Sequence, residues 1–131
     1  NFAWGSWLSA SNPVIRDIHE YCLVFSKDTF KKPSKGESSL EKEEFMESTL
    51  SVWNINAARA KKIGHPAPFP VDLPYKFINL YTYKNDLVLD PFIGSGTTAI
   101  AAKKLNRNYV GYEIEKEYIK VANNRLENEV N

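Results

Sequence analysis

The sequence predicts an α/β fold with a parallel, doubly wound sheet, and three observations support that prediction. Short apolar runs alternate with helical patterns through residues 72–129. A glycine-rich turn at 94–96 follows the first of these runs, and a carboxylate, Asp90 or Glu113, stands at the end of each. Alternating strands and helices favour a parallel sheet, which binds its ligands at the carboxyl ends of its strands.

The N-terminal part predicts a loop, a strand and a basic connection. Residues 1–17 are rich in Gly, Ser, Asn and Trp without periodicity, which indicates a loop. The apolar run 20–26 predicts a buried strand, and the lone Cys22 within it predicts an inert, buried thiol in a reducing, cytoplasmic setting. Residues 27–39 are rich in Lys, Pro, Ser and Gly, which predicts a solvated and mobile connection.

A short helix is expected next. Ser38 and Glu41 have the spacing of a capping box, so the helix is predicted to start there and to run to Thr49. Its apolar side would consist of Leu40, Phe45 and Met46. Residues 50–55 read as a short extended segment. The prolines within 64–70 exclude a helix there, because each removes a backbone donor and restricts the residue before it.

The C-terminal half predicts a helix followed by two strand–helix units. The first helix begins at 72 or 73, with Pro74 in its first turn, and ends near Tyr83. After a turn at 84–86, strands are expected at 87–89 and 109–112, and helices at 97–105 and 116–129. The inner face of the first helix would consist of Leu73, Phe77, Leu80 and Tyr81, and that of the last helix of Tyr118, Ile119, Ala122 and Leu126.

Composition limits the classes of function. With 131 residues, of which 43% are hydrophobic, the chain is long enough for one domain over 1–131. A net charge of +1 offers no whole-chain attraction for nucleic acid, so any such contact must come from a local patch. No apolar stretch approaches membrane-spanning length, so we expect a soluble protein without a membrane partner.

The turn between 90 and 98 is the strongest candidate site. Gly94 and Gly96 allow backbone angles and close approaches that a side chain would block. Glu113 ends the next strand, where nucleotide-binding α/β folds place an acid on the ribose hydroxyls. The spacing from Gly94 to Ala99 also fits the loose dinucleotide fingerprint, which keeps an NAD-dependent oxidoreductase as an alternative.

Asp90 discriminates between these cofactors. A carboxylate beside the turn would repel a pyrophosphate, but it suits a ligand with an ammonium and a sulfonium group. S-adenosylmethionine carries both. Asp90 could also merely cap the turn, Glu113 could be an ordinary surface acid, and Thr97 and Thr98 could do no more than begin a helix.

The motifs resemble those of the amino-group DNA methyltransferases of restriction-modification systems. The resemblance rests on 90–98 (DPFIGSGTT) and 111–114 (GYEI), with 65–70 (HPAPFP) just before them, as in the beta arrangement of that family. It implies a Rossmann-like domain that binds S-adenosylmethionine, with 1–64 following the catalytic strand and 65–131 forming the cofactor-binding part. The implied cofactor residues are Asp90, Pro91, Phe92, Gly94, Ser95, Gly96, Thr97, Thr98, Glu113, His65, Pro66, Ala67 and Phe69. No metal is expected, because His65 has only one other His in the chain and no Cys near it.

The chain departs from the family at one motif, because no Pro-Pro-aromatic tetrapeptide occurs in it. In the family that tetrapeptide holds the target amino group of a base flipped out of duplex DNA. We therefore expect a domain that is incomplete at its N-terminus and inactive alone, and Arg16 and Lys27 are candidate phosphate contacts. The complete enzyme would methylate adenine N6 or cytosine N4.

Two further functions remain open beside this one. A methyltransferase of the same fold could act on RNA or on a small molecule. Alternatively, the chain is the non-catalytic subunit of a split DNA methyltransferase and pairs with a second chain that carries the tetrapeptide.

Overall fold

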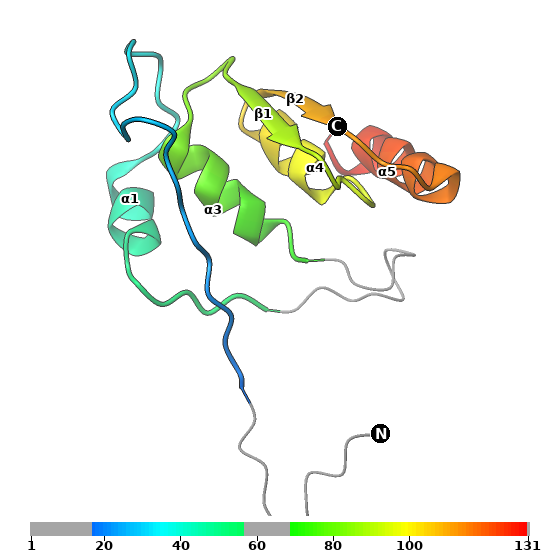
Figure 1. Cartoon of the computed structure of the whole chain (residues 1–131), viewed down its shortest axis with the longest axis horizontal. Coiled ribbons are helices and arrows are strands. Elements are labelled where there is room, and N and C mark those ends of the chain that lie inside the picture. Colours follow the sequence, from blue (N-terminus) through cyan, green and yellow to red (C-terminus); the bar gives the residue numbers. More distant parts are fainter. Residues whose placement is uncertain (1–16, 57–68, 131) are drawn as a thin grey trace, which may run out of the picture. The chain divides into compact units, whose positions relative to one another are not determined.

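The computed structural model describes residues 17–56 and 69–130, and they divide between two compact units, 1–33 and 34–131. All helices and strands of the described residues belong to the second unit (Figure 1). In chain order they are α1 (Lys42–Ser48), α3 (Asp72–Tyr81), β1 (Leu87–Asp90), α4 (Thr97–Lys104), β2 (Asn108–Gly111) and α5 (Lys116–Glu129). Within the described residues, no helix is long and apolar enough to cross a membrane.

The first unit contradicts the buried strand predicted at 20–26. Residues 17–26 form no regular secondary structure, and Tyr21, Leu23 and Phe25 are 75% to 85% exposed. Cys22 is an exposed free thiol rather than a buried one. A strand needs a neighbour for its backbone groups, and no described segment pairs with this one. Residues 27–33 are exposed, as expected of a solvated connection.

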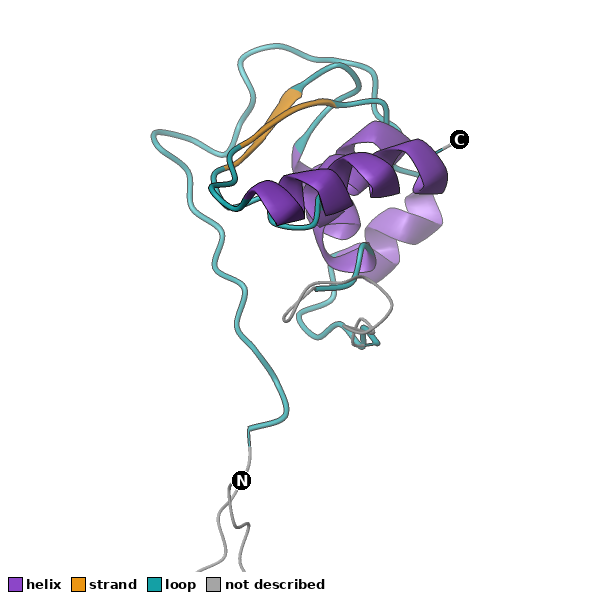
Figure 2. Cartoon of the chain, turned by 90° about the vertical axis from the view of Figure 1, so that its right-hand side faces the viewer, coloured by secondary structure: helices purple, strands orange, loops and turns teal. Residues whose placement is uncertain are grey.

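The second unit is built on a β–α–β core. β1 and β2 are parallel, with Leu87 opposite Asn108 and Asp90 opposite Gly111, and α4 is the connection between them. Small side chains of α4 let it pack closely, since Ala99, Ala101 and Ala102 are fully buried. Figure 2 shows the helices gathered on one side of the two strands. The predicted strand–helix order is confirmed, and the bounds of α5 agree with the predicted 116–129.

The prediction that the first strand is buried was only partly right. Val88 packs against the core of Ile78, Ala101, Ala102 and Leu105. Leu87 and Leu89, on either side of it, are 65% and 61% exposed. Successive side chains of a strand point to opposite faces, and the helices of the described residues cover one face of β1. The strand is therefore apolar on both faces but covered on one.

α3 uses a different inner face from the one expected. Ile78 is buried, and Tyr75 packs on the same core. Phe77 and Tyr81, which were predicted to face inward, form a separate aromatic stripe: the Phe77 ring lies 4.9 Å from that of Trp53 and 6.4 Å from that of Tyr81. The helix has two apolar stripes, and periodicity alone did not distinguish the one that meets α4.

The N-cap of α1 is Glu41, three residues after Ser38, the predicted cap. The capping box consists of Glu41 and Glu44, and the Glu44 carboxylate accepts from the Glu41 N–H at 3.5 Å. The Ser38 hydroxyl instead accepts from the N–H of Leu40 at 3.1 Å. The expected apolar side is not buried, because Phe45 and Met46 are 48% and 61% exposed.

A series of hydrogen bonds through the buried Arg107 joins α1, α3 and the turn before β2. Arg107, 4% exposed, donates to the Thr82 hydroxyl at 2.9 Å, to the Thr82 carbonyl at 2.7 Å and to the Ser39 hydroxyl at 2.6 Å. Ser39 donates to the Asn79 side chain at 2.7 Å, and Asn79 donates to the Glu44 carboxylate at 3.2 Å. Burial lowers the pKa of Arg107 below its ordinary value. Even so, an arginine stays charged in a folded protein.

Candidate functional site

The glycine turn between β1 and α4 has the geometry that its sequence predicted. Gly94 and Gly96 adopt left-handed backbone angles, with φ of 50° and 81°. The Gly96 N–H donates to the Ile93 carbonyl at 2.8 Å, and the Gly96 carbonyl accepts from the N–H of Ile100 at 3.0 Å, so Gly96 is the N-cap of α4. Left-handed angles are costly for residues with a Cβ, which explains both glycines.

Asp90 closes this turn. One carboxylate oxygen accepts from the N–H of Phe92 at 2.9 Å, and the other accepts from the hydroxyl of Thr98 at 2.6 Å. The turn-capping role left open by the sequence is therefore present. A carboxylate has about four lone-pair positions, so these two bonds leave acceptor capacity for a cationic ligand.

Glu113 lies just past the end of β2. One of its oxygens accepts from the N–H groups of Ile114 and Glu115 at 2.8 and 2.9 Å, directly before α5. Backbone bonds continue past the paired strands: Tyr112 donates to the Asp90 carbonyl, and Ile93 donates to that of Tyr112, both at 3.0 Å. The two carboxylates therefore lie at the same end of the sheet, as the parallel arrangement requires.

The surface around the turn combines buried backbone with exposed aromatic side chains. The glycines and the two hydroxyl residues beside Gly96, Ser95 and Thr97, are buried, and Thr98 is half-buried. Pro91 is exposed, as is Phe92, 86% of whose surface meets solvent. An apolar side chain this exposed, at the edge where the candidate site lies, offers a surface on which a flat ring could pack.

Other predicted site residues are less well placed. Phe69, just before α3, is 42% exposed. Lys27 is exposed and belongs to the first unit. His65, Pro66, Ala67 and Arg16 lie outside the described residues.

A third glycine, Gly111, lets the turn sit against the end of β2. A Cβ at Gly111 would lie 2.2 Å from Cδ1 of Ile93, well inside any real contact. Its φ is ordinary, so the requirement is for space rather than for an unusual backbone angle.

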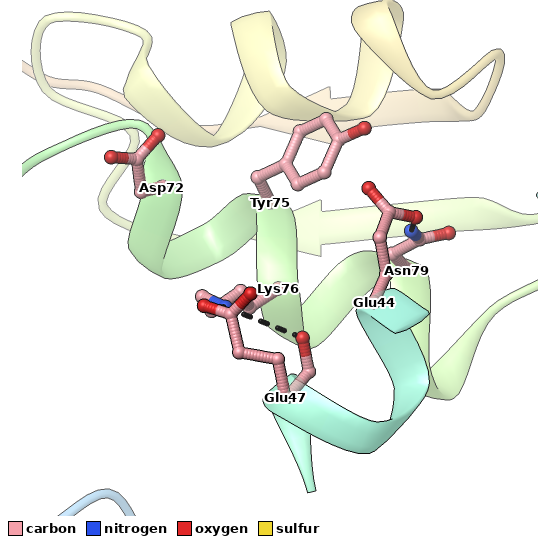
Figure 3. Close-up of a pocket in the computed structure, with 7 residues that line it drawn as sticks. Glu44, Glu47, Asp72, Tyr75, Lys76 and Asn79 are labelled. Atoms are coloured by element: carbon pink, nitrogen blue, oxygen red, sulfur yellow. Dashed lines mark hydrogen bonds and ion pairs between the residues drawn. The ribbon is translucent and has the colours of Figure 1, made fainter. Parts of the chain in front are cut away.

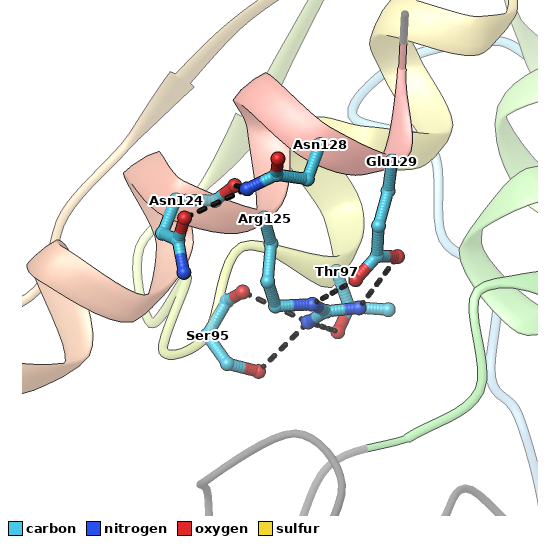
Figure 4. A network of polar contacts seen from close by, with 6 residues as sticks. All are labelled: Ser95, Thr97, Asn124, Arg125, Asn128 and Glu129. Atoms are coloured by element: carbon cyan, nitrogen blue, oxygen red, sulfur yellow. Dashed lines mark hydrogen bonds and ion pairs between the residues drawn. The ribbon is translucent and has the colours of Figure 1, made fainter.

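Sequence reasoning missed Arg125 of α5. It is 8% exposed, and its guanidinium contacts Ser95 and Thr97 of the turn and Glu129 of its own helix (Figure 4). The i,i+4 spacing of Arg125 and Glu129 was a visible signal of an ion pair. Its second partner was not visible, because Ser95 is 30 residues away in the chain.

A small cavity lies elsewhere, between α1 and α3 (Figure 3). It encloses about 170 Å³ and is lined by Glu44, Glu47, Ser48, Asp72, Tyr75, Lys76 and Asn79. Two of its acids are engaged, Glu47 with Lys76 at 3.2 Å and Glu44 with Asn79. Burial, with a smaller contribution from Glu44, raises the pKa of Tyr75. No residue of the glycine turn lines this cavity, so we do not assign the cofactor to it.

Among residues 17–56 and 69–130, no group of three or more His, Cys, Asp or Glu side chains is arranged to hold a metal ion.

Comparison with known proteins identifies the family. The model of the DNA methylase family, N6/N4 type, matches residues 3–124. The type II methyltransferase M.BglI of Bacillus subtilis is 42% identical over 128 residues, which cover 95% of this chain and 36% of the relative.

Solved structures are similar in fold. A protein of Thermus thermophilus, TTHA0409, named as a DNA modification methylase and complexed with S-adenosyl-L-methionine, is 31% identical with a TM-score of 0.63, over 78% of this chain and 40% of its own. The cytosine-N4-specific PvuII DNA methyltransferase is 29% identical with a TM-score of 0.56, over 68% of this chain and 35% of its own.

This chain thus spans less than half the length of the relatives it matches. The described residues are one part of the Rossmann-like α/β fold of these proteins. Because the family model covers nearly all of the sequence, the chain belongs to the N6/N4 DNA methylase family.

Proposed function

We propose that this chain binds S-adenosylmethionine at the end of β1 and β2. The adenosine part lies over the turn from Gly94 to Gly96, and the ribose hydroxyls donate to Glu113. Asp90 faces the positively charged methionine part, which the 65–69 segment also contacts. The observation that carries the proposal is that the parallel pairing brings Asp90, the glycine turn and Glu113 to one end of the sheet.

Asp90 and Glu113 can serve this purpose while they hold the local backbone. Each carboxylate makes two described bonds to its own loop, which fixes its direction before a ligand arrives. A prearranged carboxylate costs less to order upon binding than a freely rotating one. The exposed Phe92 ring adds an apolar surface at the same edge.

We further propose that the complete enzyme methylates adenine N6 or cytosine N4 in duplex DNA. Bound S-adenosylmethionine would supply the methyl group: the amino nitrogen of a flipped base would form the new N–C bond as the methyl–sulfur bond breaks, S-adenosylhomocysteine would leave, and the nitrogen would release one proton. This chain contains no Pro-Pro-aromatic tetrapeptide, so the group that orients the amino nitrogen would come from a preceding segment or from a second chain. On this proposal the chain alone binds the cofactor but transfers no methyl group. The enzyme acts in the cytoplasm. Arg16 and Lys27 are candidate contacts to the DNA phosphates.

Calorimetry tests the cofactor site. The purified chain is titrated with S-adenosylmethionine, S-adenosylhomocysteine and NAD. Asp90→Asn keeps polar partners for Phe92 and Thr98 but removes the charge, and Glu113→Gln does the same beside Ile114. We expect each variant to bind S-adenosylmethionine about tenfold more weakly, because each loses a hydrogen bond between the ligand and a charged group.

A matched control is Glu117→Gln on α5, whose exposed carboxylate pairs with Lys120 at the surface. It should bind like the unsubstituted chain. Tighter binding of NAD than of S-adenosylmethionine would contradict the proposal, as would wild-type affinity in both site variants.

A further inference from the structure

The guanidinium of Arg125 joins α5 to both residues that flank Gly96 (Figure 4). One of its terminal nitrogens, Nη1, donates to the Ser95 carbonyl at 2.8 Å, and to the Ser95 and Thr97 hydroxyls at 3.1 Å. Ser95 and Thr97 are 4% and 3% exposed, so water is a poor replacement for this donor. A buried acceptor that loses its partner is costly.

Glu129 holds the guanidinium in place. Nε and Nη2 of Arg125 donate to its two carboxylate oxygens at 2.8 and 3.3 Å. A two-point pair of this kind fixes the plane of the guanidinium as well as its position. It also neutralises the charge close to a turn that, on the proposed function, receives a cationic cofactor.

The same helix contacts the glycine between these two residues. A Cβ on Gly96 would lie 2.9 Å from the Cβ of Ala122, which precedes Arg125 by three residues and so shares its face of α5. α5 therefore touches three successive residues of the turn, Ser95 and Thr97 through Arg125 and Gly96 through Ala122.

These contacts set the peptide between Ser95 and Gly96 from both ends. Its carbonyl accepts from Arg125, and its N–H donates to the Ile93 carbonyl at 2.8 Å. Because the peptide unit is planar and trans, its two ends point in opposite directions and cannot rotate independently. If Arg125 were absent, one end would be released, and this glycine peptide has little steric barrier to rotation.

We propose that Arg125 is a positioning residue that sets the conformation of the 95–97 turn for the cofactor without touching the cofactor itself. The proposal rests on the proposed function, which places the adenosine part over this turn. A turn already in its binding conformation does not have to be ordered when the ligand binds, so affinity depends on what holds it.

Amide hydrogen exchange on the ligand-free chain gives the first test. Arg125→Met keeps much of the side-chain volume but removes every donor, and Arg125→Lys retains a charge that cannot bridge the same acceptors. We expect exchange in the 94–98 turn to accelerate about tenfold in Arg125→Met, with β1 and α3 unchanged. Lys120→Met is the matched control, because Lys120 lies on the same helix but pairs with Glu117 at the surface.

Calorimetric titration with S-adenosylhomocysteine gives the second test, at a temperature at which circular dichroism shows each variant to be folded. Arg125→Met should bind about tenfold more weakly, Arg125→Lys should lie in between, and Lys120→Met should match the unsubstituted chain. If Arg125→Met does not fold, Arg125→Lys carries both measurements.

Three results distinguish the possible failures. Unchanged exchange at 94–98 in the Arg125 variants would overturn the proposal. Faster exchange with unchanged affinity would also overturn it, because Arg125 would then hold a turn that the ligand does not need. No binding by the unsubstituted chain would contradict the proposed function, and the exchange rates would still decide whether Arg125 holds the turn.

Discussion

Arg107 and Arg125 are both buried, yet they hold different parts of the molecule. Arg107 connects Ser39, Thr82 and the end of α4, and none of its described contacts is with the glycine turn. Arg125 connects α5 to the turn itself. Arg107 has neutral hydrogen-bond acceptors, whereas Arg125 also has a carboxylate partner, Glu129. A buried arginine thus joins structural elements in one region, and another contacts the candidate binding site in the other region.

The largest effect that would test this contrast is expected for Arg107→Met. The substitution leaves the Thr82 carbonyl and two hydroxyls without their buried donor, so we expect a loss of roughly 3 kcal/mol in the free energy of unfolding. Chemical denaturation measures it. The affinity of the folded fraction for S-adenosylhomocysteine should not change.

Lys104→Met, an exposed cation near the end of α4, is the control and should be nearly neutral. A loss of affinity in Arg107→Met as large as in Arg125→Met would remove the distinction between the two arginines.

A smaller effect, about 2 kcal/mol, is expected for Gly111→Ala. The new methyl group would collide with Ile93, so the turn must move away from β2 and both stability and cofactor affinity should fall. Denaturation and calorimetry measure the two losses. The double variant with Ile93→Ala should recover part of the affinity, because the two substitutions act at one contact. Additive losses would show that the contact does not position the turn.

The smallest expected effect is the pH dependence of folding stability that comes from Tyr75, which belongs to the region around Arg107. Burial raises its pKa above the ordinary value of 10.0, so the neutral phenol is favoured in the folded state. The stability that the folded state gains in this way is fully present below pH 10.0. It is lost as the pH rises through the pKa of Tyr75 in the folded state, because the phenol of the unfolded chain releases its proton at a lower pH.

Tyr75→Phe should therefore lose less stability than the unsubstituted chain in thermal melts above pH 10.0. Tyr109→Phe, at an exposed position of β2, serves as the control. Parallel alkaline losses in Tyr75→Phe and the unsubstituted chain would contradict the assignment of this pH dependence to Tyr75.

The local elements were largely predictable because their signals are local. The turn at 94–96, the strands around it and the 116–129 helix follow from glycine placement and from hydrophobic periodicity over a few residues. Asp90 and Glu113 were predicted to be site residues for the same reason, since each lies at the end of an expected strand. The capping box of α1 was misplaced because Ser38, Glu41 and Glu44 offer two boxes with the same spacing, and only one can form.

What the sequence by itself determined is the order of strands and helices, the left-handed glycines of the turn and the end of the sheet at which two carboxylates meet. The tertiary structure alone decided which face of α3 is buried, that 20–26 pairs with no described strand, and that Arg125 and Arg107 are interior. The burial of the two arginines depends on partners 25 or more residues away, as Arg107 is from Thr82 and Arg125 is from Ser95. Burial is a property of the packed neighbours, and no short pattern in the sequence records them.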